Sequence, residues 1–395
     1  MNITVIGQGY VGLPLAITAS EAGYTVFGLD NNVEKVSVLK SGKSIIEDLS
    51  NEVIKKCIDT KLYIPTTDEK VISDSEVVLI CVPTPLSNSH KPDLTSLISA
   101  VTTVGKNLKR GALVIVESTI EPGTCQNILL HILLKESGLK LSDFELAYSP
   151  ERIDPTNKKW GIRNTPKLVA GLTDSTAKRA KEFYEKFIDA VSICSSLEIA
   201  ETAKLLENSF RLVNISFINE LAIFCQKIGI DISEVISAAA TKPYGFMPFY
   251  PSVGVGGHCI PVDPIYLANA AKAVGTPSRF IELADQINQE MPGYFVGRAE
   301  EKLGGLKNKR VLVVGVSYKP NVADVRESPV KALIAGLKQK GAQVSWHDDL
   351  VKSWNGEKSV ALGNNFDLAI IATPHDYLDL TKLENVPILN TRGSI

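Results

Sequence analysis

The sequence has 395 residues, which is too long for one ordinary hydrophobic core and predicts two or three domains. Its composition, 44% hydrophobic and 22% charged, is that of an ordinary globular protein. The 42 basic and 44 acidic residues give a formal net charge of -2, so we expect no nucleic-acid partner, and any anion site must be local.

The chain begins directly with an apolar strand pattern, so we expect no signal peptide. No apolar run is long enough to span a bilayer, and we expect no membrane partner. The six cysteines lie far apart without a CxxC pair, which argues against a metal site and against a disulfide framework. These features together favour a reduced, cytoplasmic protein.

The N-terminal part alternates short apolar runs with helical patterns. Residues 2–7 predict a strand that ends on glycine, residues 13–23 a helix, and residues 25–30 a second strand. Such alternation is typical of a parallel sheet with helices on both faces. Further buried strands are expected at residues 77–82, 113–117 and 145–148.

From residue 199 to about residue 225 the pattern becomes helical throughout. The apolar positions of this stretch are Ala203, Leu206, Phe210, Val213, Phe217, Leu221 and Phe224. A helix of this length is expected to link domains or to build a dimer interface. Residues 230–295 also look mainly helical, apart from the segment 243–264, which is rich in proline and glycine.

A second α/β pattern begins with a strand at residues 310–315. It continues with a helix at about residues 328–340 and strands at residues 343–347 and 368–372. We therefore predict two separate doubly wound α/β units around a helical middle with one long helix. The expected boundaries are residues 1–195, 196–295 and 296–395.

The first motif is Gly7-x-Gly9-x-x-Gly12, at the end of a strand and the start of a helix. The glycines permit a tight turn, approach of a pyrophosphate to the backbone, and close packing of helix and strand. Asp30 ends the second strand, where a carboxylate would accept hydrogen bonds from a ribose diol and repel the 2′-phosphate of NADP. These features predict NAD, although Lys35 lies close enough to weaken the preference.

Two later strands end in polar turns, Pro83-Thr84 and Ser118-Thr119. Turns at the carboxyl edge of such a sheet line the cofactor crevice, so their hydroxyls are candidates for the nicotinamide ribose or a catalytic water. A simple rigid turn and an ordinary cap are the structural alternatives.

The most informative motif is Gly256-Gly257-His258-Cys259, followed by Asp263. If a helix begins near Pro261, Cys259 lies just before its N-terminus, where a thiolate is stabilised. The alternative is a buried apolar cysteine in a loop. His258 is as well explained by a hydrogen bond within the loop as by catalysis.

Lys204 and Asn208 are one helical turn apart and therefore share a side of the long helix. A solvated helix face is the alternative explanation. The segment Ser317-Tyr318-Lys319, followed by Arg326, repeats the pattern of a strand ending on glycine but lacks a full GxGxxG. A phosphate or uridine site fits it better than a second dinucleotide.

Together these motifs resemble the UDP-glucose/GDP-mannose dehydrogenase family over essentially the whole chain. The matching segments are GxGYVGLPLA, Ser118-Thr119, Tyr148-Ser149-Pro150-Glu151-Arg152, Lys204 with Asn208, GGHC with Asp263, and Ser317-Tyr318-Lys319 with Arg326. The resemblance implies two Rossmann-like doubly wound domains joined by a central helical dimerisation domain with one long helix. It also implies two NAD⁺ per turnover, oxidation of a nucleotide sugar to the uronate for surface polysaccharide synthesis, and a homodimer or higher oligomer.

The resemblance also implies residue roles. Cys259 would be the nucleophile, surrounded by the catalytic residues Lys204, Asn208, Asp263, Thr119 and Glu151. The cofactor would contact Gly7, Gly9, Tyr10, Val11, Gly12, Asp30, Lys35, Pro83, Thr84, Ser118, Thr119 and Arg326. The UDP-sugar would contact Glu151, Arg152, Lys204, Asn208, Arg211, Tyr250, Gly256, His258, Tyr318, Lys319 and Arg392, the last as a partner-domain arginine.

Two departures bear on the substrate. The branch acting on UDP-glucose usually has a second acid where Pro155 stands, and it lacks a histidine beside the nucleophilic cysteine. The forms SPERIDP and GGHCIPVDP look more like the branch acting on UDP-N-acetylhexosamines. We therefore expect UDP-N-acetylglucosamine, with UDP-N-acetylmannosamine and UDP-glucose as alternatives.

Two other classes of protein are alternatives. A β-hydroxyacid dehydrogenase performing a single oxidation would need neither Cys259 nor a second α/β domain. A silent NAD-binding regulator would be recognised by loss of Cys259, Lys204 or Asp263, and all three are present.

Overall fold

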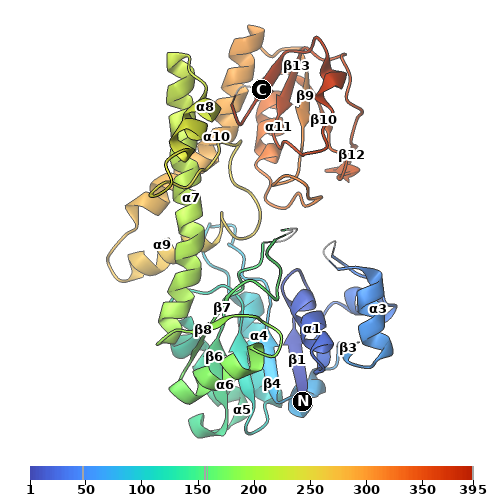
Figure 1. Cartoon of the computed structure of the whole chain (residues 1–395), viewed down its shortest axis with the longest axis vertical. Helices are drawn as coiled ribbons and strands as arrows, with labels where there is room; N and C mark the ends of the chain where they lie inside the picture. Colours follow the sequence, from blue (N-terminus) through green and yellow to red (C-terminus); the bar gives the residue numbers. More distant parts are fainter. Residues whose placement is uncertain (47–48, 155–156, 158, 394–395) are drawn as a thin grey trace. The chain divides into compact units, whose positions relative to one another are not determined.

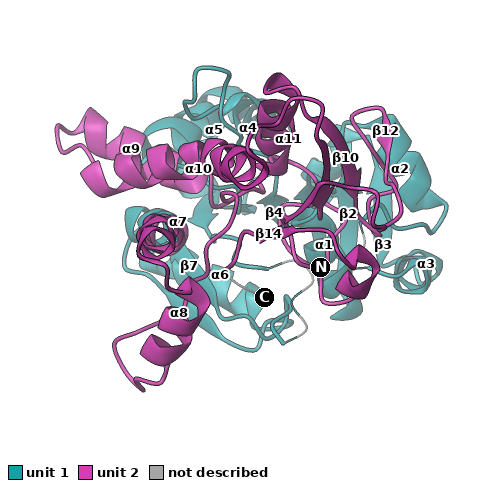
Figure 2. Cartoon of the chain, turned by 90° about the horizontal axis from the view of Figure 1, so that it is seen from above, with its two compact units in different colours: residues 1–206 teal, residues 207–395 magenta. Residues whose placement is uncertain are grey.

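The computed structural model describes residues 1–46, 49–154, 157 and 159–393 of the chain (Figure 1). These residues form two compact units, divided between residues 206 and 207 (Figure 2). One long helix, α7, begins in the first unit and continues into the second. Within the described part of the chain, no helix is both long and apolar enough to cross a bilayer.

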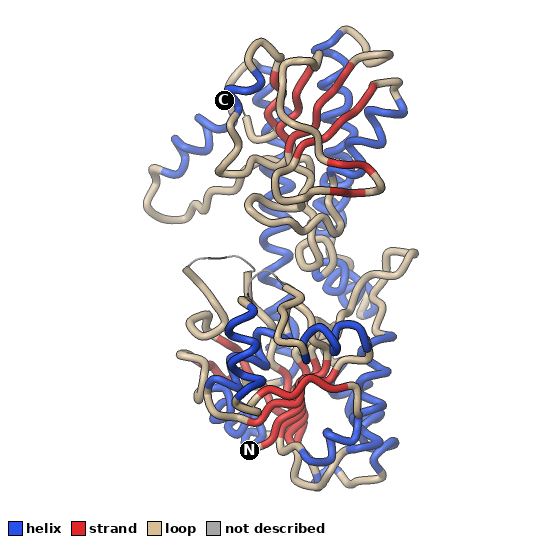
Figure 3. Tube along the Cα trace, turned by 90° about the vertical axis from the view of Figure 1, so that its right-hand side faces the viewer, coloured by secondary structure: helices blue, strands red, loops and turns tan. Residues whose placement is uncertain are grey.

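The first unit is built on an eight-stranded sheet with the order β3-β2-β1-β4-β5-β6-β7-β8. Figure 3 draws its strands in red, with helices in blue around them. The order reverses between β1 and β4, and open sheets of this kind bind ligands at the carboxyl edge beside that point. All neighbours pair parallel except β6 and β7. The strands are β1 (Asn2–Ile6), β2 (Thr25–Leu29), β3 (Tyr63–Thr66), β4 (Val77–Ile80), β5 (Leu113–Val116), β6 (Glu145–Tyr148), β7 (Lys167–Gly171) and β8 (Val191–Ile193).

Both faces of this sheet are buried. Leu113 and Ile115 pack into one apolar cluster, whereas Val114 and Val116 pack into another on the opposite face. This explains why the strands appear in the sequence as continuous apolar runs. The helices are α1 (Gly12–Glu21), α2 (Val33–Lys40), α3 (Asn51–Asp59), α4 (Thr95–Asn107), α5 (Leu130–Ser137) and α6 (Asp174–Tyr184), with short helical turns η1 (Glu69–Asp74), η2 (Cys125–Leu129) and η3 (Leu141–Asp143).

The second unit combines helices with a smaller parallel sheet of order β10-β9-β13-β14. Leu312 and Val313, neighbours on β9, belong to separate apolar clusters, so this sheet too is covered on both faces. The predicted fold, Rossmann-like at both ends with helices between them in the sequence, is confirmed. The elements are α8 (Ile232–Ala240), α9 (Asp263–Ala273), α10 (Arg279–Leu303), β9 (Arg310–Val314), α11 (Val330–Gln339), β10 (Gln343–His347), β11 (Ser353–Trp354), β12 (Glu357–Lys358), β13 (Leu368–Ile371), η4 (Leu380–Leu383) and β14 (Ile388–Asn390).

Helix α7 (Leu197–Ile228) has 32 residues and an inverted distribution of polarity. Polar Glu201 and Lys204 are buried, whereas large apolar side chains face outward. The exposed apolar residues recur at intervals of seven and four residues and are between 47% and 60% exposed. We call them the α7 stripe: Ile199, Leu206, Phe210, Phe217, Phe224 and Ile228.

Candidate active site

The turn between β1 and α1 requires glycine for close packing. A Cβ on Gly7 (φ +91°) would lie 2.6 Å from the Cys81 carbonyl oxygen, and one on Gly12 would lie 1.9 Å from the Gly7 carbonyl oxygen. A Cβ on Gly9 would meet nothing within 4 Å, so the backbone is open there. Because no side chain caps α1, its first amides suit phosphate oxygens, and the turn fits a dinucleotide pyrophosphate. The same turn contains Tyr10 and Val11.

Asp30 directly follows β2 and is only 7% exposed. Its carboxylate accepts hydrogen bonds from the amides of Gln8 and Asn32, each over 2.9 Å. Lys35 Nζ lies 3.6 Å from the same carboxylate. An acid fixed in this place fits a ribose diol, and Lys35 offsets part of the repulsion that it exerts on a 2′-phosphate.

The turns after β4 and β5 are tied to each other. Ser118 Oγ donates a hydrogen bond to the Val82 carbonyl over 2.7 Å. Pro83 is exposed and Thr84 half-buried in the first turn, and Thr119 is half-buried in the second. Since the Ser118 hydroxyl proton holds the two turns together, Thr119 is the better placed donor of the pair.

A buried charged pair under this edge was not predicted. Lys167 Nζ lies 2.9 Å from Glu117 Oε2, and the Tyr184 hydroxyl donates to the other carboxylate oxygen. Glu117 is 2% exposed and Lys167 9% exposed. The group fixes the end of β5 immediately before Ser118. Glu117 and Lys167 are separated by 50 residues in sequence, so no local sequence pattern could predict the pair.

Glu151 and Arg152 follow β6 in the same unit. Arg152 Nη1 donates to the Pro166 carbonyl over 2.7 Å, while the Glu151 carboxylate accepts from the Ile153 amide. Burial raises the pKa of the Glu151 carboxyl more than the Lys204 charge and the Ile153 amide lower it. A carboxyl with a raised pKa is suited to proton transfer near neutral pH. Pro155, the predicted departure from the UDP-glucose branch, lies outside the described residues.

The polar side of α7 is buried, which excludes the solvated-face alternative. Glu201 is 0%, Lys204 6% and Asn208 9% exposed. Glu201 accepts hydrogen bonds from the amides of Gly123 (2.5 Å) and Cys125 (3.1 Å), so it fixes the turn that follows Thr119 to the helix. The pattern of the sequence had not assigned a role to Glu201.

In the second unit, Asn208 Nδ2 donates to Asp263 Oδ2 over 2.6 Å. Helix α9 begins at Asp263, two residues later than the expectation near Pro261. The Asp263 amide donates to the Cys259 carbonyl over 2.8 Å, which fixes the cysteine just before the helix. The Cys259 side chain is exposed, so the alternative of a buried apolar cysteine is wrong.

The glycines before Cys259 allow its loop to lie against Tyr318. A Cβ on Gly256 would come within 2.9 Å of Tyr318 Cβ, and one on Gly257 (φ +83°) within 2.9 Å of the Tyr318 ring. The Gly257 amide also donates to the Arg326 carbonyl over 3.3 Å. His258 is exposed on this loop. The predicted thiol loop and the predicted substrate segment are therefore packed together within one unit.

The two cations of the substrate segment contact their own neighbours. Arg326 Nη2 forms an ion pair with Asp324 Oδ2 over 2.5 Å, and Lys319 Nζ lies 5.8 Å from the centre of the Tyr318 ring. Among the described His, Cys, Asp and Glu side chains, no group of three could hold a metal ion.

Three further residues were predicted to contact the substrate: Arg211, Tyr250 and Arg392. Arg211 and Tyr250 are exposed, and Arg392 is half-buried. Burial lowers the pKa of Arg392, against the opposing effect of Asp376 and Tyr250. The Arg392 carbonyl accepts a hydrogen bond from Ser233 Oγ over 2.9 Å.

Comparison with known families identifies three consecutive segments of the UDP-glucose/GDP-mannose dehydrogenase family. Residues 1–188 match its NAD binding domain, residues 198–290 its central domain, and residues 312–393 its UDP binding domain. The chain is 36% identical to the UDP-N-acetyl-D-glucosamine 6-dehydrogenase of Pseudomonas aeruginosa, covering 89% of this chain and 84% of the relative. It is 33% identical to the UDP-N-acetyl-D-mannosamine dehydrogenase of Pyrococcus horikoshii, covering 98% and 92%.

Solved structures agree with this assignment. A UDP-D-ManNAc dehydrogenase from Pyrococcus horikoshii superposes with a TM-score of 0.91 at 31% identity, covering 99% of this chain and 95% of the other. A UDP-glucose dehydrogenase from Pyrobaculum islandicum superposes with a TM-score of 0.89 at 25% identity, covering 99% and 94%.

Proposed function

The chain belongs to the UDP-glucose/GDP-mannose dehydrogenase family, and we propose that it oxidises the C6 alcohol of a UDP-N-acetylhexosamine to the carboxylate. The observation that carries the proposal is the exposed thiol of Cys259. The backbone carbonyl of this residue accepts a hydrogen bond from the Asp263 amide, which fixes the cysteine just before α9. A thiol with this exposure can reach a substrate, and a helix N-terminus favours its thiolate.

The thiol explains how one site can perform two oxidations. The first oxidation turns the alcohol into an aldehyde, and Cys259 Sγ then adds to the aldehyde carbon to form a thiohemiacetal. Loss of a second hydride gives a thioester, which water hydrolyses to the carboxylate and the free thiol. Because the aldehyde is covalently held, it does not escape between the two steps.

Buried polar groups of α7 serve the charges that develop. Lys204 and Asn208, one turn apart on α7, donate to the oxygen that becomes negative in each tetrahedral species. Asp263 accepts a 2.6 Å hydrogen bond from Asn208 Nδ2 and so fixes the orientation of the Asn208 amide group. The second N–H of this amide is then the donor to the developing oxyanion. Glu151, with its raised pKa, and the Thr119 hydroxyl serve proton transfer and the positioning of water.

The cofactor fits the first unit. The open backbone at Gly9, the uncapped start of α1 and the Asp30 carboxylate would hold the pyrophosphate and the ribose diol of NAD. When bound there, NAD⁺ supplies the hydride acceptor of the oxidations.

UDP-N-acetylglucosamine is our preferred substrate, with UDP-N-acetylmannosamine as the principal alternative and UDP-glucose after it. Relatives named for each of the two hexosamines match the chain at 36% and 33% identity. Rates of NADH formation with the two hexosamines distinguish the gluco isomer from the manno isomer.

The test is NADH formation with purified protein and a panel of UDP-N-acetylglucosamine, UDP-N-acetylmannosamine, UDP-glucose and GDP-mannose. Product masses should show two hydrogens replaced by one oxygen. Oxidation of one N-acetylhexosamine far above the other sugars supports the proposal. No oxidation of any nucleotide sugar would overturn it.

The α7 stripe supports a homodimer. Six large apolar residues repeat along one side of a 32-residue helix, and a second copy of the same helix offers a matching surface. We therefore propose that two chains associate through α7.

A further inference from the structure

Each of the two units contains an equivalent hydrogen bond at the same place in its fold. In each unit the first strand ends in a glycine turn, and the amide after the glycine donates to an aspartate at the end of the neighbouring strand. Gln8 N donates to Asp30 Oδ2 over 2.9 Å, and Val316 N donates to Asp348 Oδ2 over 2.9 Å. Asp348 therefore occupies in the second unit the position that Asp30 occupies in the first.

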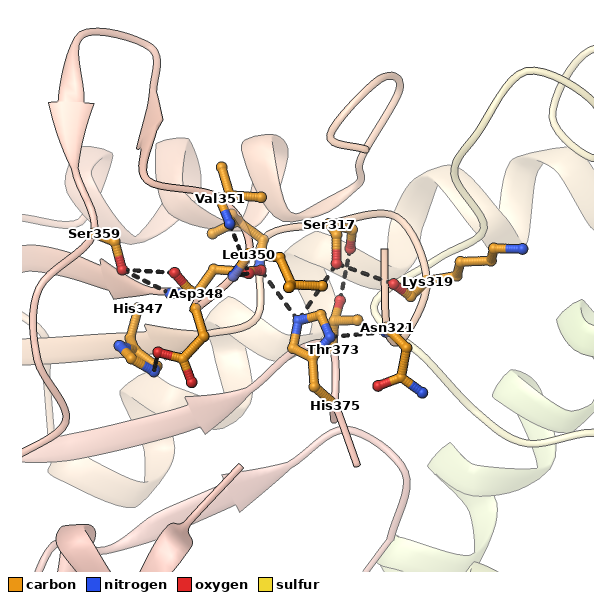
Figure 4. A network of polar contacts seen from close by, with 12 residues as sticks. Ser317, Lys319, Asn321, His347, Asp348, Leu350, Val351, Ser359, Thr373 and His375 are labelled. Carbon is orange, nitrogen blue, oxygen red and sulfur yellow. Dashed lines mark hydrogen bonds and ion pairs between the residues drawn. The ribbon is translucent and has the colours of Figure 1, made fainter. Parts of the chain in front are cut away.

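The surroundings of the two acids differ. Asp348 is fully buried, and its Oδ1 accepts from the amides of Leu350 (3.0 Å) and Val351 (3.1 Å) (Figure 4). Its Oδ2 accepts from His375 Nε2 over 3.1 Å in addition to the Val316 amide. Each oxygen of Asp348 accepts two hydrogen bonds, whereas each oxygen of Asp30 accepts one from an amide, so Asp348 has no lone pair left for a ribose diol. The His375 imidazole takes up the second acceptor position of Oδ2.

His375 also holds the loop that follows the glycine turn. The Asn321 amide donates to His375 Nδ1 over 2.9 Å. A ring nitrogen that accepts carries no proton, so the proton of the neutral imidazole is on Nε2, directed at Asp348. Burial alone would raise the pKa of Asp348, but the hydrogen bonds from His375 and from the Val316 and Val351 amides hold it below its ordinary value.

The loop from Ser317 to Asn321 is thus fixed at both ends. Thr373 Oγ1 donates to the Ser317 carbonyl over 2.8 Å, while Asn321 Nδ2 donates to Asp376 Oδ2 over 2.8 Å. Asn321 has φ +65°, a left-handed conformation that needs support in any residue other than glycine. The His375 and Asp376 contacts supply that support. Lys319 lies between the two fixed ends.

We propose that His375 is a positioning residue for the nucleotide sugar: its Nδ1 accepts the hydrogen bond from the Asn321 amide and thereby holds Lys319 ready for the diphosphate of the substrate. This inference rests on the proposed function, because it assigns the loop to UDP-sugar binding. A loop that is ordered before binding loses less entropy when the ligand arrives, so the expected benefit is affinity.

Two substitutions separate the two hydrogen bonds of the His375 ring. In His375→Asn the amide oxygen lies near the former Nδ1 and can accept from the Asn321 amide, but nothing reaches Asp348. In His375→Gln the amide nitrogen lies near the former Nε2 and can donate to Asp348, but nothing accepts from Asn321. If holding the loop is what matters, the asparagine variant keeps affinity and the glutamine variant loses it.

The matched control is His347→Ala. His347 is also buried and precedes Asp348, but its Nδ1 contacts the Val360 carbonyl over 2.6 Å, away from the Ser317–Asn321 loop. His375→Ala and His347→Ala should both lower the melting temperature. Only His375→Ala should raise the KM for the nucleotide sugar, by about tenfold for one lost hydrogen bond, with little change in kcat or in the KM for NAD⁺.

Calorimetry with UDP measures the same effect without turnover. We expect His375→Ala and His375→Gln to weaken UDP binding by about tenfold, and His375→Asn to bind nearly as the parent protein does. Unchanged binding in the glutamine variant, or an equal loss in His347→Ala, would overturn the inference. A parent protein that binds UDP but oxidises no nucleotide sugar would instead contradict the proposed function, while the comparison of variants still decides the role of His375.

Discussion

The Cys259 side chain is exposed, and its backbone carbonyl is fixed by the amide of Asp263 over 2.8 Å. We expect Cys259→Ser to bind NAD⁺ and substrate but to turn over more slowly by orders of magnitude. A serine ester can form in place of the thioester, but it hydrolyses more slowly because an alkoxide is the poorer leaving group. Intact-protein mass spectrometry with substrate and NAD⁺ should therefore reveal a covalent sugar adduct.

Cys194→Ser is the control for this variant. Cys194 is half-buried and lies outside the glycine loop, so its replacement should leave kcat unchanged. Full activity in Cys259→Ser would mean that the thiol is only a loop residue, and the covalent mechanism would fail.

At Asp30 the expected effect is on cofactor choice. The carboxylate is held by two amides and repels a 2′-phosphate, so the protein should prefer NAD⁺. Asp30→Ala removes the like charge, and the ratio of kcat/KM for NAD⁺ over NADP⁺ should fall by at least about tenfold. Steady-state kinetics with both cofactors measure it. A parent protein that prefers NADP⁺ would contradict the role assigned to Asp30 in binding the ribose diol.

At the scale of an element, the loop before Cys259 is sensitive to a single methyl group. Gly257→Ala places a Cβ 2.9 Å from the Tyr318 ring at φ +83°, whereas Gly229→Ala has a similar φ of +77° with nothing within 4 Å. Both should lose about 1 kcal/mol of stability through backbone strain. Only Gly257→Ala displaces the thiol loop, which should lower kcat by about a hundredfold. Equal activity of the two variants would show that the Tyr318 contact is unimportant.

The α7 stripe makes association sensitive to charge. Phe217 is 59% exposed within the stripe, so Phe217→Glu should place a charge in an apolar interface and shift the protein to monomer. Val33→Glu, at a residue 70% exposed on α2, should leave the molar mass unchanged. Light scattering after gel filtration distinguishes the states. A parent protein that is already monomeric at micromolar concentration would refute the proposed dimer.

Helix α7 also shows what sequence periodicity can and cannot predict. The spacing of apolar residues predicted a long helix, and one of 32 residues is present. It did not reveal which side is buried: Phe210 and Phe217 are exposed, whereas Lys204 and Asn208 are inside. Periodicity shows that polar and apolar side chains lie on different sides of a helix, but it does not show which side is buried. In α7 the usual rule that the apolar side faces the core does not hold.

Contacts between distant segments set the other limit. The glycine turn and Asp30 were predictable because their geometry is local and repeats a known spacing. The Glu117–Lys167 pair and the His375–Asp348 pair join side chains that are 50 and 27 residues apart, and each partner alone resembles an ordinary strand end. Only the order of the strands in the sheet brings such partners together.

For the whole molecule, the aspartates at the equivalent strand ends of the two Rossmann-like sheets determine how many NAD molecules one chain can bind. The first unit has an open backbone at Gly9 and an aspartate whose oxygens each accept one amide hydrogen bond, whereas each oxygen of the aspartate in the second unit accepts two. We therefore expect one NAD site in each chain. Two oxidations at one site require that NADH leaves and a second NAD⁺ enters while the sugar is retained.

That requirement yields a stoichiometric prediction. Calorimetry should count one NAD⁺ bound per chain, whereas limiting substrate should produce two NADH per sugar at the absorbance endpoint. Semicarbazide, which traps free aldehydes, should leave the ratio at two, because the intermediate is held by Cys259 during cofactor exchange. With Cys259→Ala the thiohemiacetal cannot form, so semicarbazide should capture any aldehyde and the ratio should fall to one. A ratio of one in the parent protein would mean a single oxidation, and the role proposed for the exposed thiol would have to be abandoned.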